Sequence, residues 1–309
     1  MKISIVTGTF NEQDNIGEFY ERCVAVMRTH PKYEYEFIVA DNRSTDLTQL
    51  RLAEIAGRDP NFKVIFNANN FGFVRSQFNA LLQATGDAVV FMFSDLQDPP
   101  EVINEFIEKW ESGYQVVCGV KDQTTPEGFL MTRIRRCYYK FLKRISDVEL
   151  INNFYGFGLY DKSVVRAMSQ YGAAYPYLRG LIAEVGFRRC LVAYTQAKRS
   201  RGKSSFNFWR MYDVAMTGVV NYSKVPLRAA VFSGCALAVV SFGIAFITFI
   251  LKLLDRNYFS VGIAAIIIGL FFFSGVILVF LGIIGEYIIA IFRQVRSDPL
   301  VVEERRLNF

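Results

Sequence analysis

Two long runs of uncharged, apolar residues near the C-terminus constrain this chain more than any other feature. Ala229–Leu251 contains no charged residue, and Val261–Gly285 is also uncharged and is followed by Glu286. As helices, the runs would span roughly 35 Å, which exceeds the ~30 Å hydrocarbon core of a bilayer. A buried core helix would be shorter and would have a polar face. The sequence therefore predicts two transmembrane helices.

The link between the two runs, Lys252–Ser260, is too short to form a domain, so the predicted helices form a hairpin with both ends on one side of the membrane. The cations on that side are Lys224, Arg228, Arg293, Arg296, Arg305 and Arg306, against Lys252 and Arg256 in the link. The positive-inside rule then predicts that the head, residues 1–228, and the tail, 293–309, are cytoplasmic. No signal peptide is expected, because polar residues follow Met1–Thr7 at once.

Charge is distributed unevenly along the chain. Residues 1–128 carry a net charge of −8, residues 129–228 carry +13 and residues 229–309 carry +1. A basic block just before apolar segments indicates contact with anionic lipid head groups or with a phosphorylated ligand. Nucleic acid is the weaker interpretation beside membrane segments, and we do not expect it as a partner. Five cysteines without paired spacing and a single histidine argue against a disulfide scaffold and a zinc site.

The first half of the head alternates short apolar runs with helical stretches. The strand-like runs are Ile3–Thr7, Glu36–Ala40, Lys63–Phe66, Ala88–Phe93 and Gln115–Val120. The helical stretches are Asp14–Arg28, Asp46–Gly57, Phe73–Ala84 and Pro100–Ser112. This order predicts an α/β fold with a doubly wound, mainly parallel sheet and ligands at the carboxyl ends of its strands. The expected units are residues 1–128, 129–228, 229–292 with both apolar helices, and the tail 293–309.

Polar and acidic segments follow three of the predicted strands, at Thr9–Glu12, Asp41–Asp46 and Ser94–Asp98. Taken singly, each acid is better explained as a turn or N-cap residue, Asp46 and Asp98 in particular. Together, they would repel one another without a counter-charge, and Mg²⁺ supplies one by binding one or two carboxylates with phosphate oxygens. The three segments therefore predict a nucleotide-diphosphate site. No Walker-type loop or dinucleotide glycine motif accompanies it.

The basic block contains two predicted amphipathic helices and a loop. Phe129–Ile145 surrounds its apolar residues with six cations, which favours a helix in the membrane interface over one packed on the head. Ser205–Tyr222 carries interfacial aromatic residues, and for it the two alternatives are equal. Between them, Lys198–Ser205 has four cations and a glycine. We interpret this segment as a flexible phosphate-binding loop, with a solvated charged loop as the alternative.

Several segments resemble the family 2 glycosyltransferases of GT-A fold. They are IVTGTFNEQDNI, ADNRSTDLT, the run from NNFGFVRSQFN to SDLQDPPEVI, and YSKVPLR. They are most similar to polyprenyl-phosphate hexosyltransferases, which include dolichol-phosphate mannose synthases, and the two apolar runs best match the bacterial glucosyl branch. The resemblance covers roughly the whole chain.

The resemblance implies an inverting enzyme at the cytoplasmic face of a bacterial-type inner membrane. It would transfer a hexose, by our first choice glucose from UDP-glucose, to a polyprenyl phosphate such as undecaprenyl phosphate, and give a β-linked product. A GDP-mannose or aminoarabinose donor, or a catalytically impaired scaffold, are the alternatives. Gly282 and Gly285 would allow close contact between helices, which is weak support for a homo-oligomer.

By the same resemblance, Glu12 and Asp41 line the nucleoside pocket, with Asp41 at the base. Asp95 and Gln97 hold Mg²⁺ or Mn²⁺ against the diphosphate. The family usually has Asp-Ala-Asp-Leu-Gln at this point, and Phe93 stands in place of the first acid. A single carboxylate should bind the metal weakly without nucleotide.

The basic loop and a later segment also match the family. Arg199 matches the arginine of the segment Arg-x-x-Gly-x-Ser/Thr, and this loop, with Lys203, is expected to close over the donor and acceptor phosphates. Asp161 is either a catalytic acid or the N-cap of the helix that follows it. Gly156 and Gly158 replace an acid and an arginine of the family's Gly-Asp-Phe-Arg-Leu segment. A lipid phosphate, with a second pKa near ~6, is largely dianionic and needs no strong general base.

Overall fold

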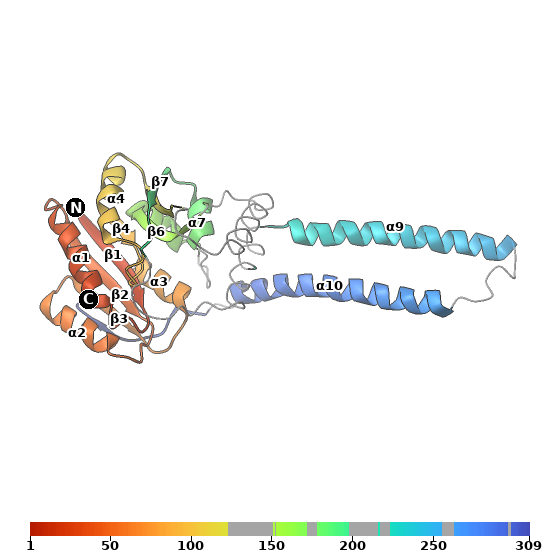
Figure 1. The fold of residues 1–309 in the computed structure, drawn as a ribbon, viewed down its shortest axis with the longest axis horizontal. Coiled ribbons are helices and arrows are strands. Elements are labelled where there is room, and N and C mark those ends of the chain that lie inside the picture. The colour runs from red at the N-terminus through yellow and green to blue at the C-terminus, as the bar shows by residue number, and fades with distance from the viewer. Residues whose placement is uncertain are drawn as a thin grey trace.

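The computed structural model describes residues 1–122, 151, 153–171, 178–197, 216, 223–254, 263–295 and 298–309. An α/β head carries two long helices, α9 (Val225–Leu254) and α10 (Ile263–Val295), which extend from it side by side (Figure 1). The predicted basic helix Phe129–Ile145 and basic loop Lys198–Ser205 lie outside the described residues, as does Ser205–Tyr222 except for Met216. These predictions are therefore not tested by the structure.

One eight-stranded mixed sheet forms the head, in the order β7-β5-β6-β4-β1-β2-β3-β8. The strands are β1 (Lys2–Thr9), β2 (Glu34–Asp41), β3 (Phe62–Asn67), β4 (Ala88–Phe91), β5 (Val116–Lys121), β6 (Phe154–Asp161), β7 (Arg189–Tyr194) and β8 (Glu303–Leu307). The predicted parallel pairing is confirmed for β4-β1-β2-β3 and also joins β5 to β7. Strands β6 and β8 pair in antiparallel fashion with their neighbours, so the sheet is mixed beyond its centre.

Helices cover both faces of the sheet. The helical elements of the head are α1 (Ile16–Arg28), α2 (Thr48–Arg58), α3 (Phe73–Leu82), the short 3₁₀ helix η1 (Pro100–Val102), α4 (Ile103–Glu111), α6 (Lys162–Ser169) and α7 (Leu178–Val185). One apolar layer packs α1, α2 and α4 on the sheet, around Phe37 and Phe106. The other packs α3, α6 and α7, around Ile38 and Tyr160. The central strands are buried on both faces, which explains their continuous apolar sequences.

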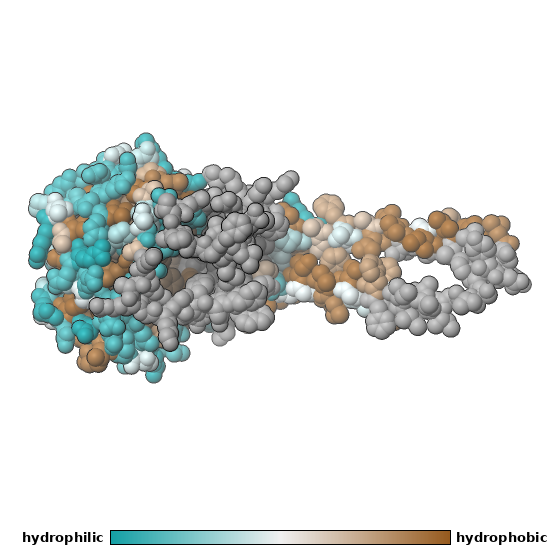
Figure 2. Space-filling view, viewed as in Figure 1, coloured by the Kyte–Doolittle hydropathy of each residue, from teal (hydrophilic) through white to brown (hydrophobic). Residues whose placement is uncertain are grey.

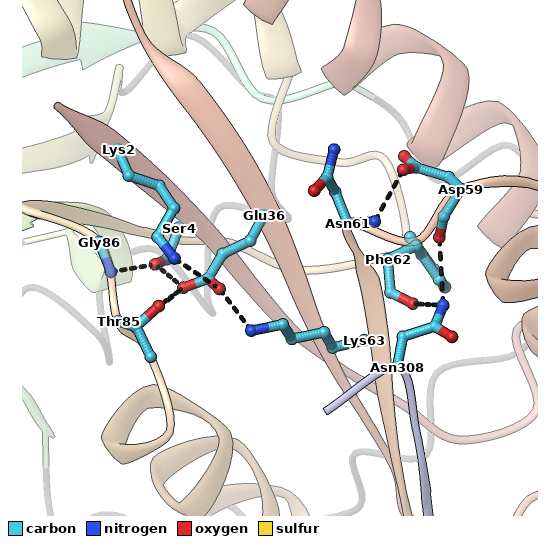
Figure 3. A network of polar contacts seen from close by, with 10 residues as sticks. All are labelled: Lys2, Ser4, Glu36, Asp59, Asn61, Phe62, Lys63, Thr85, Gly86 and Asn308. Atoms are coloured by element: carbon cyan, nitrogen blue, oxygen red, sulfur yellow. Dashed lines mark hydrogen bonds and ion pairs between the residues drawn. The ribbon is translucent and has the colours of Figure 1, made fainter.

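The C-terminal tail contributes a strand, which the sequence analysis missed. After α10 the chain returns to the head, and β8 pairs with β3 at the edge of the sheet. The backbone N–H of Ala68 donates to the carbonyl of Val302 (2.9 Å). The side-chain amide of Asn308 donates to the carbonyl oxygens of Asp59 and Phe62, at 3.2 and 2.9 Å (Figure 3), and to that of Ala56, at 2.8 Å. The charged sequence of β8 gave no strand signal, because an edge strand is held mainly through its backbone.

The two long helices are strongly apolar, and the side of the head seen in Figure 2 is mainly hydrophilic. Within the described residues, one stretch of α10, Phe272–Phe292, is long and apolar enough to cross a membrane. In α9 the comparable apolar stretch, Val225–Leu237, is shorter. Both predicted helices are therefore present, and one of them qualifies as a span by length and hydropathy.

A buried carboxylate joins three strands at the amino-terminal end of the sheet (Figure 3). Glu36 in β2 is 2% exposed and accepts hydrogen bonds from Lys63 (2.8 Å) and Lys2 (3.3 Å). Its other oxygen accepts from the hydroxyl of Ser4 (2.6 Å) and from the backbone and hydroxyl of Thr85 (both 2.8 Å). Burial alone would raise the pKa of Glu36, but the hydrogen bonds from Lys63, Ser4 and Thr85 lower it to about 2.

Replacing Glu36 by Gln should lower the free energy of unfolding at pH 7 by about 3 kcal/mol, the scale for breaking a buried ion pair. Glu34→Gln is the matched control, because Glu34 lies exposed in the same strand. The folded pKa lies below the unfolded value of about 4.3, so the stabilisation is present above that pH and is lost as the pH falls towards 2. Urea denaturation in detergent, followed by tryptophan fluorescence, measures both effects. Equal stability of the two variants at pH 7 would contradict this role.

Candidate active site

The three predicted polar segments lie together at the carboxyl ends of neighbouring strands. Thr9 at the end of β1 is in register with Asp41 at the end of β2, and β4 pairs with β1 on its other side. Each of the three loops that follow contains a non-glycine residue with positive φ: Asn11 (58°), Arg43 (62°) and Leu96 (57°). Such residues are uncommon and gather at functional sites. The sequence prediction of one shared site is supported by this geometry.

Asp41 is fully buried, and its carboxylate organises the first two loops. It accepts hydrogen bonds from the hydroxyl of Thr9 (3.1 Å), from the backbone and hydroxyl of Ser44 (3.0 and 2.5 Å) and from the amide of Gln49 (2.9 Å). These four donors use most of its acceptor capacity. Asp41 thus fixes the loops at the predicted nucleoside pocket, and its contact with a base stays a prediction.

Glu12 lies in the turn before helix α1 and bridges the same loops. Its carbonyl accepts from the backbone of Asn15 and Ile16, its side chain accepts from the amide of Asn15 (2.6 Å), and its N–H donates to the hydroxyl of Thr48 (2.8 Å). Asp46 accepts from the backbone N–H of Thr48 (3.0 Å), the first residue of α2. The N-cap of α2 is Leu47, so Asp46 forms a turn in the loop before the helix, which is the other alternative for it, and Glu12 stays a candidate for the nucleoside pocket.

The loop after β4 holds the candidate metal ligands Asp95 and Gln97. The backbone N–H of Gln97 donates to Asp95 (3.2 Å), and the buried Leu96 between them anchors the turn. The hydroxyl of Ser94 donates to the carbonyl of Gly8 (3.1 Å), which ties the loop to β1. No group of three His, Cys, Asp or Glu side chains that could hold a metal occurs among the described residues. One carboxylate and one amide oxygen fit Mg²⁺ or Mn²⁺ only if phosphate oxygens complete its shell.

Asp98 caps no helix, contrary to one expectation from the sequence. It is 1% exposed and accepts from the hydroxyl of Tyr194 (2.6 Å) and the amide of Gln196 (3.4 Å). Burial raises the pKa of Asp98 to about 6, although Tyr194 and the charge of Lys121 oppose the shift. The N–H of Ala197 also donates to the carbonyl of Gln97 (2.9 Å). The end of β7 is therefore fastened to the candidate metal loop.

Two cations outside the predicted basic loop lie beside the candidate metal loop, and they were not identified from the sequence. The ammonium of Lys121, at the end of β5, lies 4.3 Å from the ring centroid of Tyr155, and the guanidinium of Arg179 in α7 lies 4.1 Å from it. Aromatic rings stabilise cations in this position. Lys121 directly follows a predicted strand, which was an available signal. Arg179 had none, because α7 was not predicted.

The predicted residue Asp161 lies at the other end of the sheet. It is in register with Ala88, the first residue of β4, whereas the candidate site follows the last. Its carboxylate accepts from the backbone of Ser163 (2.9 Å) and from the indole of Trp110 (2.9 Å). The N-cap alternative is therefore confirmed, and Asp161 is too far along the strand to share a site with Asp95.

The two glycines that depart from the family pattern have structural causes. Gly156 has a φ of +107°, which residues with side chains rarely adopt. A Cβ atom at Gly158 would lie 2.3 Å from the carbonyl oxygen of Val117 in β5. Side chains at these two positions would therefore require a different pairing of β5 and β6. The observed strand geometry thus excludes the acid and the arginine of the family pattern.

Arg199 and Lys203 lie outside the described residues. The chain is described as far as Ala197, whose N–H bonds to Gln97. The predicted basic loop therefore starts one residue beyond a contact with the candidate metal loop. This position is compatible with the predicted roles of Arg199 and Lys203, which stay predictions.

Comparison with known proteins identifies the family of the chain. Residues 4–168 match the model of Glycosyl transferase family 2. The glycosyltransferase YkcC of Bacillus subtilis is 32% identical over 99% of this chain and 94% of its own length. The bactoprenol glucosyl transferase of Shigella phage SfII is 31% identical over 97% of this chain and 96% of its own, and a prophage homologue from Escherichia coli K12 is 30% identical over 99% of both. The resemblance seen in the sequence is confirmed, and the chain belongs to glycosyl transferase family 2, with a head of GT-A type.

Proposed function

We propose that this enzyme transfers a hexose from a nucleotide-diphosphate sugar to polyprenyl phosphate, with inversion at the anomeric carbon. The main support is similarity to bactoprenol glucosyl transferases along almost the entire chain, including both long helices. UDP-glucose is the proposed donor, and the product is then a β-linked polyprenyl-phosphate glucose. GDP-mannose and an aminoarabinose donor are the alternatives.

The donor site is proposed at the carboxyl ends of β1, β2 and β4. Glu12 and Asp41 shape the nucleoside pocket, and Asp95 with Gln97 would hold Mg²⁺ or Mn²⁺, which neutralises charge on the diphosphate. Ser94 and Gln97 fasten this loop to β1 and to the end of β7. These contacts hold the donor-binding side chains in place before the donor arrives, which favours catalysis by positioning.

The acceptor side needs cations rather than a strong base. The lipid phosphate is largely dianionic at neutral pH and must approach an anionic diphosphate. Lys121 and Arg179 lie over Tyr155 beside the candidate metal loop. We propose that they, with Arg199 and Lys203, offset the repulsion in the transition state. One oxygen of the lipid phosphate then forms the bond to the anomeric carbon, and the nucleoside diphosphate leaves.

We also propose that α9 and α10 both cross the membrane. Strand β8, which follows α10, pairs with β3 of the head. A chain whose two ends share one sheet must cross a membrane an even number of times. If Phe272–Phe292 crosses, α9 is the described helix available for the return. The head and tail would then face the cytoplasm of a bacterial-type inner membrane, in contact with anionic lipid.

A screen of radiolabelled nucleotide sugars with polyprenyl phosphate in detergent tests the function. UDP-glucose should give a lipid-linked product that depends on Mg²⁺ or Mn²⁺. Asp95→Asn should abolish transfer without loss of folding, and Gln97→Ala should have a smaller effect, because a neutral amide holds a cation less strongly than a carboxylate. Asp46→Asn is a matched control, because Asp46 is an acid in the adjoining loop whose carboxylate accepts from the backbone of Thr48. Product formed at the normal rate in EDTA, or by Asp95→Asn, would refute the metal site.

Arg199→Ala should lower transfer to the lipid phosphate by on the order of 10²-fold, the scale for removing one transition-state charge contact. Arg199→Lys should recover only part of the rate, since the planar guanidinium binds phosphate oxygens in pairs. Binding of the nucleotide alone should weaken much less. Single-turnover rates and nucleotide titrations measure the two effects. A near-normal rate in Arg199→Ala would place the phosphate contact elsewhere in the basic block.

The proposed topology is tested by labelling introduced cysteines in intact cells. A membrane-impermeant thiol reagent should modify Asn257→Cys, in the link between the helices, and should not modify Phe309→Cys in the tail. The unsubstituted chain gives the background from its own cysteines. The opposite labelling pattern would exclude a cytoplasmic head.

A further inference from the structure

Buried polar atoms without hydrogen-bond partners gather at one end of the sheet. In the described part of the chain they are Thr7 Oγ1, Asn67 Oδ1, and Nε2 and Oε1 of Gln77. Thr7 and Asn67 lie at the carboxyl ends of β1 and β3, and Gln77 lies in α3, which packs over β1 and β2. A buried polar atom without a partner lowers the stability of the folded state, so native proteins retain few of them without a reason.

Gln77 is the most unusual member, because neither atom of its amide is paired. The residue is 2% exposed. A Cβ atom at Gly8 would lie 2.6 Å from its Cγ and 3.2 Å from its Nε2. The amide therefore occupies the space that a side chain at Gly8 would fill. The carbonyl of Gly8 accepts from the hydroxyl of Ser94 (3.1 Å), so Gln77 lies against the backbone that joins β1 to the Asp95 loop.

Two other buried side-chain amides at this end of the sheet, those of Asn67 and Asn42, each make at least one hydrogen bond, which sets Gln77 apart. The amide N–H of Asn67 donates to the hydroxyl of Ser76 (2.9 Å). Asn42 donates to Asn70 (2.7 Å) and accepts from the backbone N–H of Phe71 (3.0 Å). These bonds hold the loop between β3 and α3 in place. The amide of Gln77 contributes nothing comparable, so its retention has no structural explanation among these contacts.

We infer that Gln77 is a positioning residue for the nucleoside diphosphate of the donor. Its amide completes its hydrogen bonds in the donor complex, with the nucleotide itself or with water held beneath it. Sites where a sequence breaks a local rule of stability are commonly functional. The inference rests on the proposed function, because it assumes that the donor occupies the carboxyl ends of β1, β2 and β4.

The test compares stability with nucleotide affinity in one variant. Gln77→Leu removes both unpaired atoms at similar volume. The melting temperature of the ligand-free, full-length protein in detergent should stay the same or rise, because an unpaired buried amide has been removed. The Kd for UDP with Mn²⁺, measured by titration calorimetry and repeated with GDP, should weaken about tenfold, the scale of one lost hydrogen bond.

Gln83→Leu is the matched control, because Gln83 ends the same helix and is half-buried, and it should leave the Kd unchanged. If Gln77→Leu fails to fold, Gln77→Met carries the test with an unbranched side chain. An unchanged Kd in the Gln77 variant would overturn the inference, whether or not the melting temperature falls. If the wild-type protein binds neither UDP nor GDP, the proposed function itself is refuted. Failure of the inference and failure of the proposed function are therefore distinguishable.

Discussion

The pairing of β8 with β3 is the constraint on which the rest of the molecule depends. It places the residues after α10 in the same sheet as the first strand of the head. Arg75 of α3 reinforces the junction by donating to the carbonyls of Leu300 (2.8 Å) and Pro299 (2.5 Å). The hairpin of α9 and α10 must therefore start and end beside the head (Figure 1). Arg75 lies in α3, and the first turn of this helix also contains Phe73. The ring of Phe73 stacks on that of Phe93, next to the candidate metal loop, with the two ring centroids 5.3 Å apart. The hairpin and the site are thus joined through one short helix.

The two ends of the sheet have different physical characters. At the amino-terminal end, the buried polar groups of the described residues are paired, as in the Glu36 cluster (Figure 3), and the half-buried Asp161 caps a helix. At the carboxyl end, the loops contain residues with positive φ, a buried carboxyl with a raised pKa at Asp98, and the unpaired amide of Gln77. Stability gained at one end offsets strain at the other. That division is an observation of the structure, and it supports the proposal of a donor site at the carboxyl end.

The sequence predicted the features that depend on local pattern. The alternation of short apolar runs with helical stretches predicted strands β1 to β5, and the polar residues after three of these strands predicted the loops of the site. The length of the two uncharged runs predicted both apolar helices. Strand β8 was missed, because backbone pairing at an edge leaves little trace in side chains such as those of Glu303–Leu307. The Lys121–Tyr155–Arg179 contact and the bond between Tyr194 and Asp98 were missed because they join distant segments. The sequence left two roles open for Asp161, because an acid before a helix can be its N-cap or a catalytic acid. The register of β6 with β4 decided in favour of the N-cap.

The departures from the family pattern change the number of charged residues at the site. Ser94 occupies the position next to Asp95, and the first acid of the usual motif is absent, so the site carries one negative charge fewer. Gly158 removes an arginine, because its backbone leaves no room for a side chain. Gly156 replaces a further acid, so two acids and one arginine are lost and these departures leave the site more positive by one charge, while the cations of Lys121 and Arg179 lie over the ring of Tyr155. For a dianionic nucleophile that needs no deprotonation, the distribution of positive charge governs the barrier more than any single acid or base. The site therefore retains what transfer to a phosphate requires.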